Sequence, residues 1–184
     1  MKKLYAIVIT ALFVSLSFFL INESADAQDW GDSRMVTNPG DITFGVGLTQ
    51  GSSTGLLENA ETGLTGQVYF TVNDEFRGGV DFTYYLIGER ELNANELNFN
   101  VHYFVRNRNR LAVYGLGGIN ISNTSGSESR WLEREGDPDT RKAGLNIGGG
   151  LEFRAGNISI FGEPKLTLLG FNQFAITGGI RYIL

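Results

Sequence analysis

The chain has 184 residues, with 15 lysines and arginines against 20 aspartates and glutamates, giving a formal net charge of −5. This acidic balance argues against a nucleic-acid partner. The absence of cysteine excludes disulfides, thiolate metal sites and a lipid-anchored cysteine. A mean hydropathy of −0.07 is compatible with a membrane protein, because alternating strands average out their two faces.

Residues 1–27 are predicted to be a signal peptide. A positive start at Lys2 and Lys3 precedes an apolar run over residues 4–21, and residues 25–27 read Ala-Asp-Ala, an A-x-A cleavage site. The run approaches the ~18-residue length of a membrane-spanning helix, so an uncleaved anchor is the alternative. Cleavage after residue 27 leads to an exported mature chain.

The mature chain is predicted to begin with a short periplasmic segment, residues 28–40, in which Trp30 rests against the rim of a barrel formed by residues 41–184. Within 41–184, eight segments alternate apolar and polar residues, which indicates strands with one apolar and one polar face. The predicted strands cover residues 42–48, 64–72, 76–86, 97–105, 111–121, 143–153, 158–168 and 174–184. The fifth is the least regular, because glycines at 115, 117 and 118 interrupt its alternation.

Alternation alone does not separate a membrane barrel from a soluble sandwich or a soluble barrel with its apolar face inward. Three patterns favour the membrane form. Tight connections near Asn73, Arg108 and Gly156 alternate with mostly longer ones, such as residues 50–63 and 122–141. The polar face is rich in Gly, Thr, Asn and Tyr, and the apolar face carries aromatic residues near the strand ends. The predicted fold is an all-β, eight-stranded antiparallel up-and-down transmembrane β-barrel.

The last predicted strand has the length of a tilted strand that crosses a bilayer. Its apolar face comprises Phe174, Ile176, Ile180, Tyr182 and Leu184. With the signal peptide, the eight strands and the phrase Phe161-Gly-Glu-Pro-Lys-Leu166, this strand makes the chain resemble small bacterial outer-membrane barrels of the OmpA/OmpX type.

The resemblance implies a location in the bacterial outer membrane, with lipids and lipopolysaccharide as neighbours. It also implies that the apolar face of the last strand is an assembly signal for the outer-membrane barrel assembly machinery. These barrels usually end on Phe, whereas this chain ends on Leu184. A monomer without a cofactor is expected.

The polar faces of the predicted strands carry a charge-balanced set of side chains: Arg77, Asp81, Glu152, Glu163, Lys165 and Arg181. An eight-stranded interior is just wide enough for side chains to fill, so these six residues are predicted to form a salt-bridged polar core. With Leu168 opposite Phe174, Arg181 would lie opposite Phe161 and within reach of Glu163. A single buried network of Glu163, Lys165 and Arg181 is then expected.

An enzyme is not predicted, because the single histidine, His102, lies beside asparagines in no recognisable catalytic arrangement. The acidic residues of the 122–141 loop read mainly as a solvated surface, with a cation site or a receptor contact as the alternative. Three functions remain open: a structural or surface-contact barrel, a narrow porin-like channel for small solutes or ions, and a soluble exported barrel for an apolar ligand.

Overall fold

The computed structural model describes residues 35–52, 62–86, 92–126, 139–169 and 172–184. Within these ranges the chain forms eight strands: β1 (Ile42–Gly51), β2 (Thr62–Thr71), β3 (Phe76–Leu86), β4 (Leu92–Arg108), β5 (Leu111–Gly126), β6 (Asp139–Ala155), β7 (Ile158–Leu168) and β8 (Gln173–Ile183). No helix in the described part of the chain is long and apolar enough to cross a membrane.

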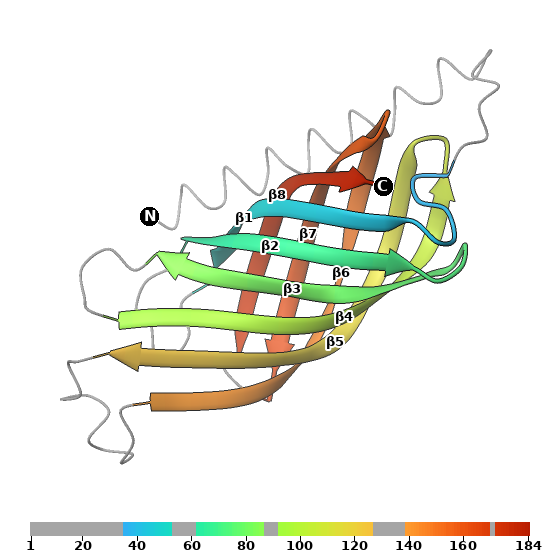
Figure 1. Ribbon diagram of the computed structural model, residues 1–184. Coiled ribbons are helices and arrows are strands. Elements are labelled where there is room, and N and C mark those ends of the chain that lie inside the picture. Colours follow the sequence, from blue (N-terminus) through green and yellow to red (C-terminus); the bar gives the residue numbers. More distant parts are fainter. Residues whose placement is uncertain (1–34, 53–61, 87–91, 127–138, 170–171) are drawn as a thin grey trace, which may run out of the picture. The chain divides into compact units, whose positions relative to one another are not determined.

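Each strand pairs antiparallel with the next, and β1 pairs with β8, which closes the barrel (Figure 1). Following paired residues once round the barrel from Ile183 leads back to β8 at Gln173, ten residues away. This stagger means that the strands are tilted against the barrel axis. The predicted all-β, eight-stranded fold is confirmed.

The apolar face of every strand points outward. Along β2, exposed residues such as Leu64, Val68 and Phe70 alternate with buried Thr65, Gln67 and Tyr69. Such a surface would be unstable in water and suits the hydrocarbon of a bilayer. The alternative of a soluble barrel with an apolar interior is therefore wrong.

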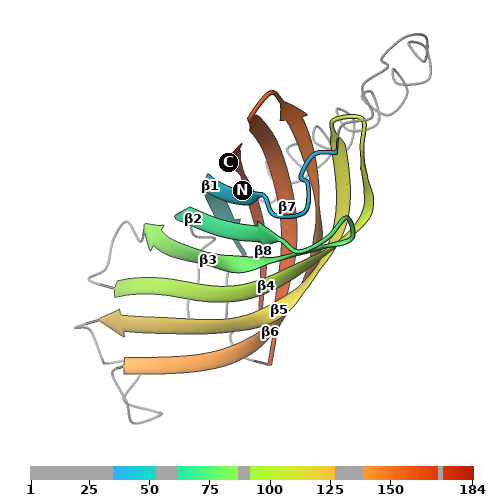
Figure 2. The same cartoon turned by 45° about the vertical axis from the view of Figure 1, so that its right-hand side comes forward.

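The turns at one end are short, spanning residues 72–75, 109–110 and 156–157, and we call this the tight-turn end. At the opposite end, β4, β5 and β6 have 17, 16 and 17 residues, against 10 or 11 in the other strands, and Figure 2 shows them running past β2 and β3. The predicted bounds were wrong here, because β4 begins at Leu92 and part of the expected 122–141 loop is strand. The pairing of Ser122 with Lys142 and its neighbours continues through residues of low strand propensity, since cross-strand contacts outweigh propensity.

Two further features depart from the expected pattern in β7. The pairing of β7 with β6 is interrupted between Gly148–Lys165 and Leu151–Gly162, beside Pro164, which has no N–H to donate. On its other side, β7 pairs with β8 so that Leu166 lies opposite Phe174. The expected register was wrong by two residues, because a two-residue shift leaves every side chain on the same face and alternation cannot detect it.

Candidate functional site in the barrel lumen

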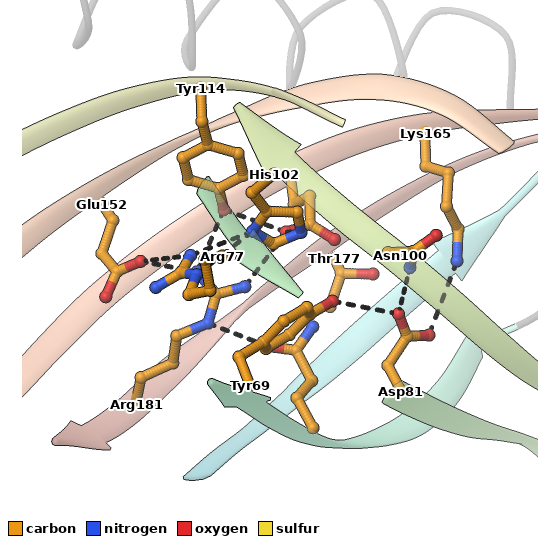
Figure 3. Close-up of polar contacts among 12 residues, drawn as sticks. Tyr69, Arg77, Asp81, Asn100, His102, Tyr114, Glu152, Lys165, Thr177 and Arg181 are labelled. Atoms are coloured by element: carbon orange, nitrogen blue, oxygen red, sulfur yellow. Dashed lines mark hydrogen bonds and ion pairs between the residues drawn. The ribbon is translucent and has the colours of Figure 1, made fainter. Parts of the chain in front are cut away.

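A cluster of buried charges fills the lumen towards the tight-turn end. We call it the charged half, and it comprises Arg77, His102, Glu152, Glu163 and Arg181, with exposures of 0–2%. Two arginines bind one carboxylate oxygen: Glu152 Oε2 lies 2.9 Å from Arg77 Nη2 and 2.7 Å from Arg181 Nη1. Ser159 donates a hydrogen bond of 2.5 Å to the other oxygen of Glu152. The carboxylate thus bridges β3 and β8 from β6 (Figure 3).

Arg181 has the most partners in this cluster. Its Nη2 lies 3.0 Å from Glu163 Oε2, its Nη1 donates to Tyr114 Oη, and its Nε donates to Gln67 Oε1, both at 3.0 Å. Its guanidinium carbon lies 3.8 Å from the centre of the Phe161 ring. Since Arg181 is opposite Ser159, its long side chain, and not strand register, brings it to Glu163.

His102 lies between two tyrosines in the charged half. Its ring is stacked on Tyr114 at 4.4 Å and tilted against Tyr69 at 4.5 Å between ring centres. His102 Nδ1 lies 3.1 Å from Arg77 Nη2, and its Nε2 is 3.7 Å from Glu163 Oε2. With both ring nitrogens turned to charged neighbours and the ring wholly buried, His102 packs the interior.

Farther from the tight turns, the lumen is lined mainly by neutral polar groups. We call this region the amide–hydroxyl half, and it comprises Thr49, Thr65, Thr83, Thr177, Asn98, Asn100, Asn120, Asn146, Asp81 and Lys165. Asp81 accepts hydrogen bonds from Asn98 (2.7 Å) and Asn100 (2.5 Å), and Lys165 Nζ lies 3.6 Å from Asp81 Oδ1. Lys165 therefore pairs with Asp81 and does not join Glu163 and Arg181, contrary to expectation.

Four threonines continue this half round the wall from β8 to β3. Thr49 Oγ1 lies 2.7 Å from Thr177 Oγ1 and 2.5 Å from Thr65 Oγ1, and Thr65 lies 2.8 Å from Thr83. On the facing strands, Asn146 donates to Asn98 and Asn100, and Asn120 donates to Asn98. Each polar group is satisfied by a near neighbour, so this half is a continuous hydrogen-bonded lining.

The tight-turn mouth of the lumen is closed by the segment that precedes β1. Val36 is wholly buried and clusters with Phe104, Ala112 and Tyr114. Asn107 accepts from Val36 N at 2.8 Å and donates to Thr37 O at 2.9 Å, while Arg154 donates to Val36 O at 2.8 Å. Trp30, expected at the rim, lies outside the described residues.

The structure thus brings four of the six predicted lumen charges into one cluster and places Asp81 and Lys165 in another. Tyr114 and Asn107 were not predicted to have a role. Tyr114 lies on an inward face that reads Ala112, Tyr114 and Leu116, which is too apolar to be recognised as lumen-facing. The predicted assembly-signal residues all lie on the outer face of β8, or, for Leu184, next to its end.

No group of three or more His, Cys, Asp or Glu side chains in the described ranges could hold a metal ion. Most of the acidic loop considered as a cation site, residues 127–138, lies outside those ranges. The lumen instead offers buried charges that are paired with one another. Its chemistry is that of a packed polar core.

Comparison with known proteins bears on the fold. No family model and no curated protein matches the sequence. Among solved structures, the N-terminal barrel domain of Pseudomonas aeruginosa OprF matches with a TM-score of 0.64 and 12% identity, covering 80% of this chain and 100% of that one. Yersinia pestis Ail, solved with the heparin analogue sucrose octasulfate, matches with a TM-score of 0.57 and 17% identity, covering 79% and 99%.

Outer membrane protein OprG of Pseudomonas aeruginosa matches as well, with a TM-score of 0.56 and 11% identity over 82% of this chain and 99% of that one. The chain has the fold of a small outer-membrane β-barrel of the OmpA/OmpX type. At these identities the likeness shows the fold alone. The function has to be argued from the residues of this chain.

Proposed function

We propose that the chain is a structural and surface-contact barrel of the bacterial outer membrane, exported by residues 1–27 and without enzymatic activity. The observation that carries this proposal is the closure of the lumen by paired charges. Arg77, Glu152, Arg181 and Glu163 form a continuous series of contacts of 2.7–3.0 Å that links four strands across the interior. A barrel filled in this way stiffens the membrane and presents its loops.

The closure is reinforced from both sides of the charged half. Val36 covers it at the tight-turn end, and the amide–hydroxyl half lies against its other side. Large solutes would have to displace buried ion pairs, and stranding a buried charge typically costs about 3–5 kcal/mol. Transport is therefore a poorer account of this interior than structure.

A liposome-swelling assay tests the proposal. The mature chain, residues 28–184, is reconstituted into liposomes and challenged with small sugars, with a known porin as the positive control. We expect swelling at the rate of protein-free liposomes. Swelling that increases with the amount of inserted barrel would favour a solute channel and displace the structural proposal.

A narrow ion channel is the second candidate, and one observation favours it. Arg77 Nη1 and His102 Nε2 are buried without a hydrogen-bond partner, as are the hydroxyls of Thr37, Thr43 and Thr71. Buried polar groups without protein partners are where ordered water is found. Ions that moved along a chain of such waters would have to pass the paired charges. Measurable ion conductance would therefore distinguish a narrow channel from a closed structural barrel.

We also propose an orientation in which the tight-turn end faces the periplasm and residues 28–40 lie there. A cysteine in place of Asp74, in the exposed turn between β2 and β3, checks it. Impermeant maleimide should label this cysteine only after the outer membrane is permeabilised. Labelling in intact cells would invert the orientation.

The outer face of β8 is proposed to contact the barrel assembly machinery, and the lipid-facing surface to contact phospholipid and lipopolysaccharide. Support comes from the exposed apolar side chains of Phe174, Ile180, Tyr182 and Leu184, which are 44–65% exposed. Replacing Tyr182 and Leu184 by serine should lower the yield of folded barrel in cells. The yield of folded barrel on refolding in detergent should fall less. Equal losses in both settings would indicate a purely structural role.

A further inference from the structure

A β-bulge in β4 changes which side chains face the membrane near the tight-turn end. The pairing of β4 with β5 shifts between Phe104 and Arg106, so Val105 is the extra residue and is 73% exposed. After the bulge, Asn107 is buried and holds the segment containing Val36. The bulge therefore turns Asn107 inward, and with it turns Arg106 outward.

The paired residues on β5 show that the side chains of two arginines lie on the outer face of the barrel. Arg106 pairs with Val113 and Arg108 with Leu111, and directly paired residues of antiparallel strands share a face. Both β5 residues flank wholly buried Ala112, so they lie on the lipid-facing side. Arg106 and Arg108, both exposed, thus stand beside apolar residues of the outer surface.

The turn after β4 adds a third arginine at a strained position. Asn109 has a φ of 54° and Arg110 a φ of 67°. Two-residue hairpin turns of this kind prefer glycine at the second position, because a side chain there is strained at positive φ. The two-residue turn between β6 and β7 has a different geometry, with its one positive φ, 69°, at its first residue, Gly156. Arg110 therefore places a third positive charge beside Arg106 and Arg108 at a backbone position that glycine would occupy with less strain.

The depth of these arginines suits the headgroup layer. Phe76 and Tyr103 form an aromatic pair on the outer surface, with ring centres 5.2 Å apart, and such rings mark the membrane interface. The arginines follow Tyr103 on the hairpin of β4 and β5, nearer the tight turn. The neighbouring turn between β2 and β3 carries Asp74 and Glu75, so the positive surface does not extend to that turn.

We propose that Arg106, Arg108 and Arg110 form a binding surface for the phosphate headgroups of anionic phospholipids in the leaflet at the tight-turn end. Guanidinium groups donate two parallel hydrogen bonds to phosphate oxygens, and the adjacent apolar residues contact the start of the acyl chains. The inference goes beyond the proposed function and rests on it only in requiring that the barrel lies in a bilayer.

Spin-labelled lipids test the proposal directly. The mature chain is inserted into phosphatidylcholine vesicles that contain a trace of spin-labelled phosphatidylglycerol or spin-labelled phosphatidylcholine, and the motionally restricted fraction of each is compared. Wild type should prefer phosphatidylglycerol, and the triple variant R106Q/R108Q/R110G should lose that preference, roughly fivefold per arginine at low salt. Wild type without a preference, or a triple variant that keeps it, would overturn the proposal.

The single variant Arg110→Gly separates binding from folding. It removes a charge while giving the turn its preferred residue, so its urea midpoint should equal or exceed that of wild type while its lipid preference falls. A lower urea midpoint in pure phosphatidylcholine without any change in lipid preference would show that the Arg110 side chain serves only the fold and would overturn its role in lipid binding. A difference in electrophoretic mobility between unheated and boiled samples confirms that each variant has folded and inserted. Failure of the wild-type chain to insert would contradict the proposed membrane function itself.

Arg141→Gln is the matched control, because Arg141 is exposed on β6 at the opposite end of the barrel. It should leave the lipid preference unchanged. If Arg141→Gln weakened the preference for phosphatidylglycerol as much as the arginine variants do, the preference would follow from net charge alone, and the proposal of a local binding site would be overturned. Inorganic phosphate, compared with chloride at the same ionic strength, should not displace the labelled phosphatidylglycerol. Displacement would make this a site for free anions and overturn the lipid assignment.

Discussion

The two halves of the lumen are polar in different ways. In the charged half, the single side chain of Arg181 contacts Glu152, Glu163 and Tyr114, so several partners depend on it. In the amide–hydroxyl half, each threonine or asparagine contacts one to three polar neighbours, as Thr65 contacts Thr49 and Thr83 and Asn146 contacts Asn98, Asn100 and Thr167. Substitutions in the charged half should therefore cost much more than substitutions among the amides and hydroxyls, although the side chains of both halves are buried.

The largest effect is expected for Arg181→Ala, which leaves Glu152 with one arginine and Glu163 without its arginine. Breaking a buried pair typically costs about 3–5 kcal/mol, so the urea midpoint should fall sharply. The double variant with Glu163→Gln and Arg181→Met should recover part of the loss, because both charges leave together. An Arg181→Ala barrel as stable as wild type would mean that water solvates this region.

An intermediate effect is expected where the segment before β1, which contains Val36 and Thr37, closes the tight-turn mouth of the lumen. Asn107→Ala removes an inward side chain that holds Val36 N and Thr37 O, and an unsatisfied buried group costs about 1–3 kcal/mol. A cysteine at Thr37, which is wholly buried in wild type, should react with thiol reagents faster in the Asn107→Ala background. Equal reaction rates would show that Asn107 does not hold the segment.

A smaller effect is expected in the amide–hydroxyl half. Thr65→Val keeps the shape of the side chain and removes two hydroxyl contacts, each worth about 1 kcal/mol or less net. Thermal or urea unfolding in detergent should show a loss well below that of Arg181→Ala. A loss as large as that of Arg181→Ala would erase the distinction between the two halves.

The smallest effect is expected on the outer surface. Ile180→Val, at a lipid-facing position that is 52% exposed, should cost no more than about 0.5–1.5 kcal/mol. It neighbours Arg181 in sequence and faces the opposite way, so it is the natural control for that variant. An equal loss at both positions would indicate damage to β8 as a whole.

Much of the fold follows from a period of two in the sequence, because one face of each strand meets lipid and the other meets the lumen. The same periodicity could not give the register of β7 with β8, since a two-residue shift preserves both faces. It also could not give the ends of β4 and β5, where Asn and Ser residues such as Ser122 are held in strands by pairing alone.

The sequence predicted which charged residues lie in the charged half, but only some of the contacts between them. Arg77, Glu152, Glu163 and Arg181 stand out as charges at lumen-facing positions. Which of them meet depends on the barrel stagger and on side-chain length, so Lys165 was assigned to the wrong partner. Tyr114 was missed because its inward face on β5 is largely apolar and because glycines obscure the alternation of this strand. One of them, Gly118, is required by packing, since a Cβ there would lie 2.3 Å from Phe99 O.

Single-channel recording in planar bilayers tests the central claim that the charged half closes the lumen. Wild type and Thr65→Val should insert without conductance steps, whereas Arg181→Ala should give discrete openings, because the contact that joins Glu152 to Glu163 is gone. Steady conductance of the wild-type barrel, or openings of Thr65→Val as large as those of Arg181→Ala, would contradict the account.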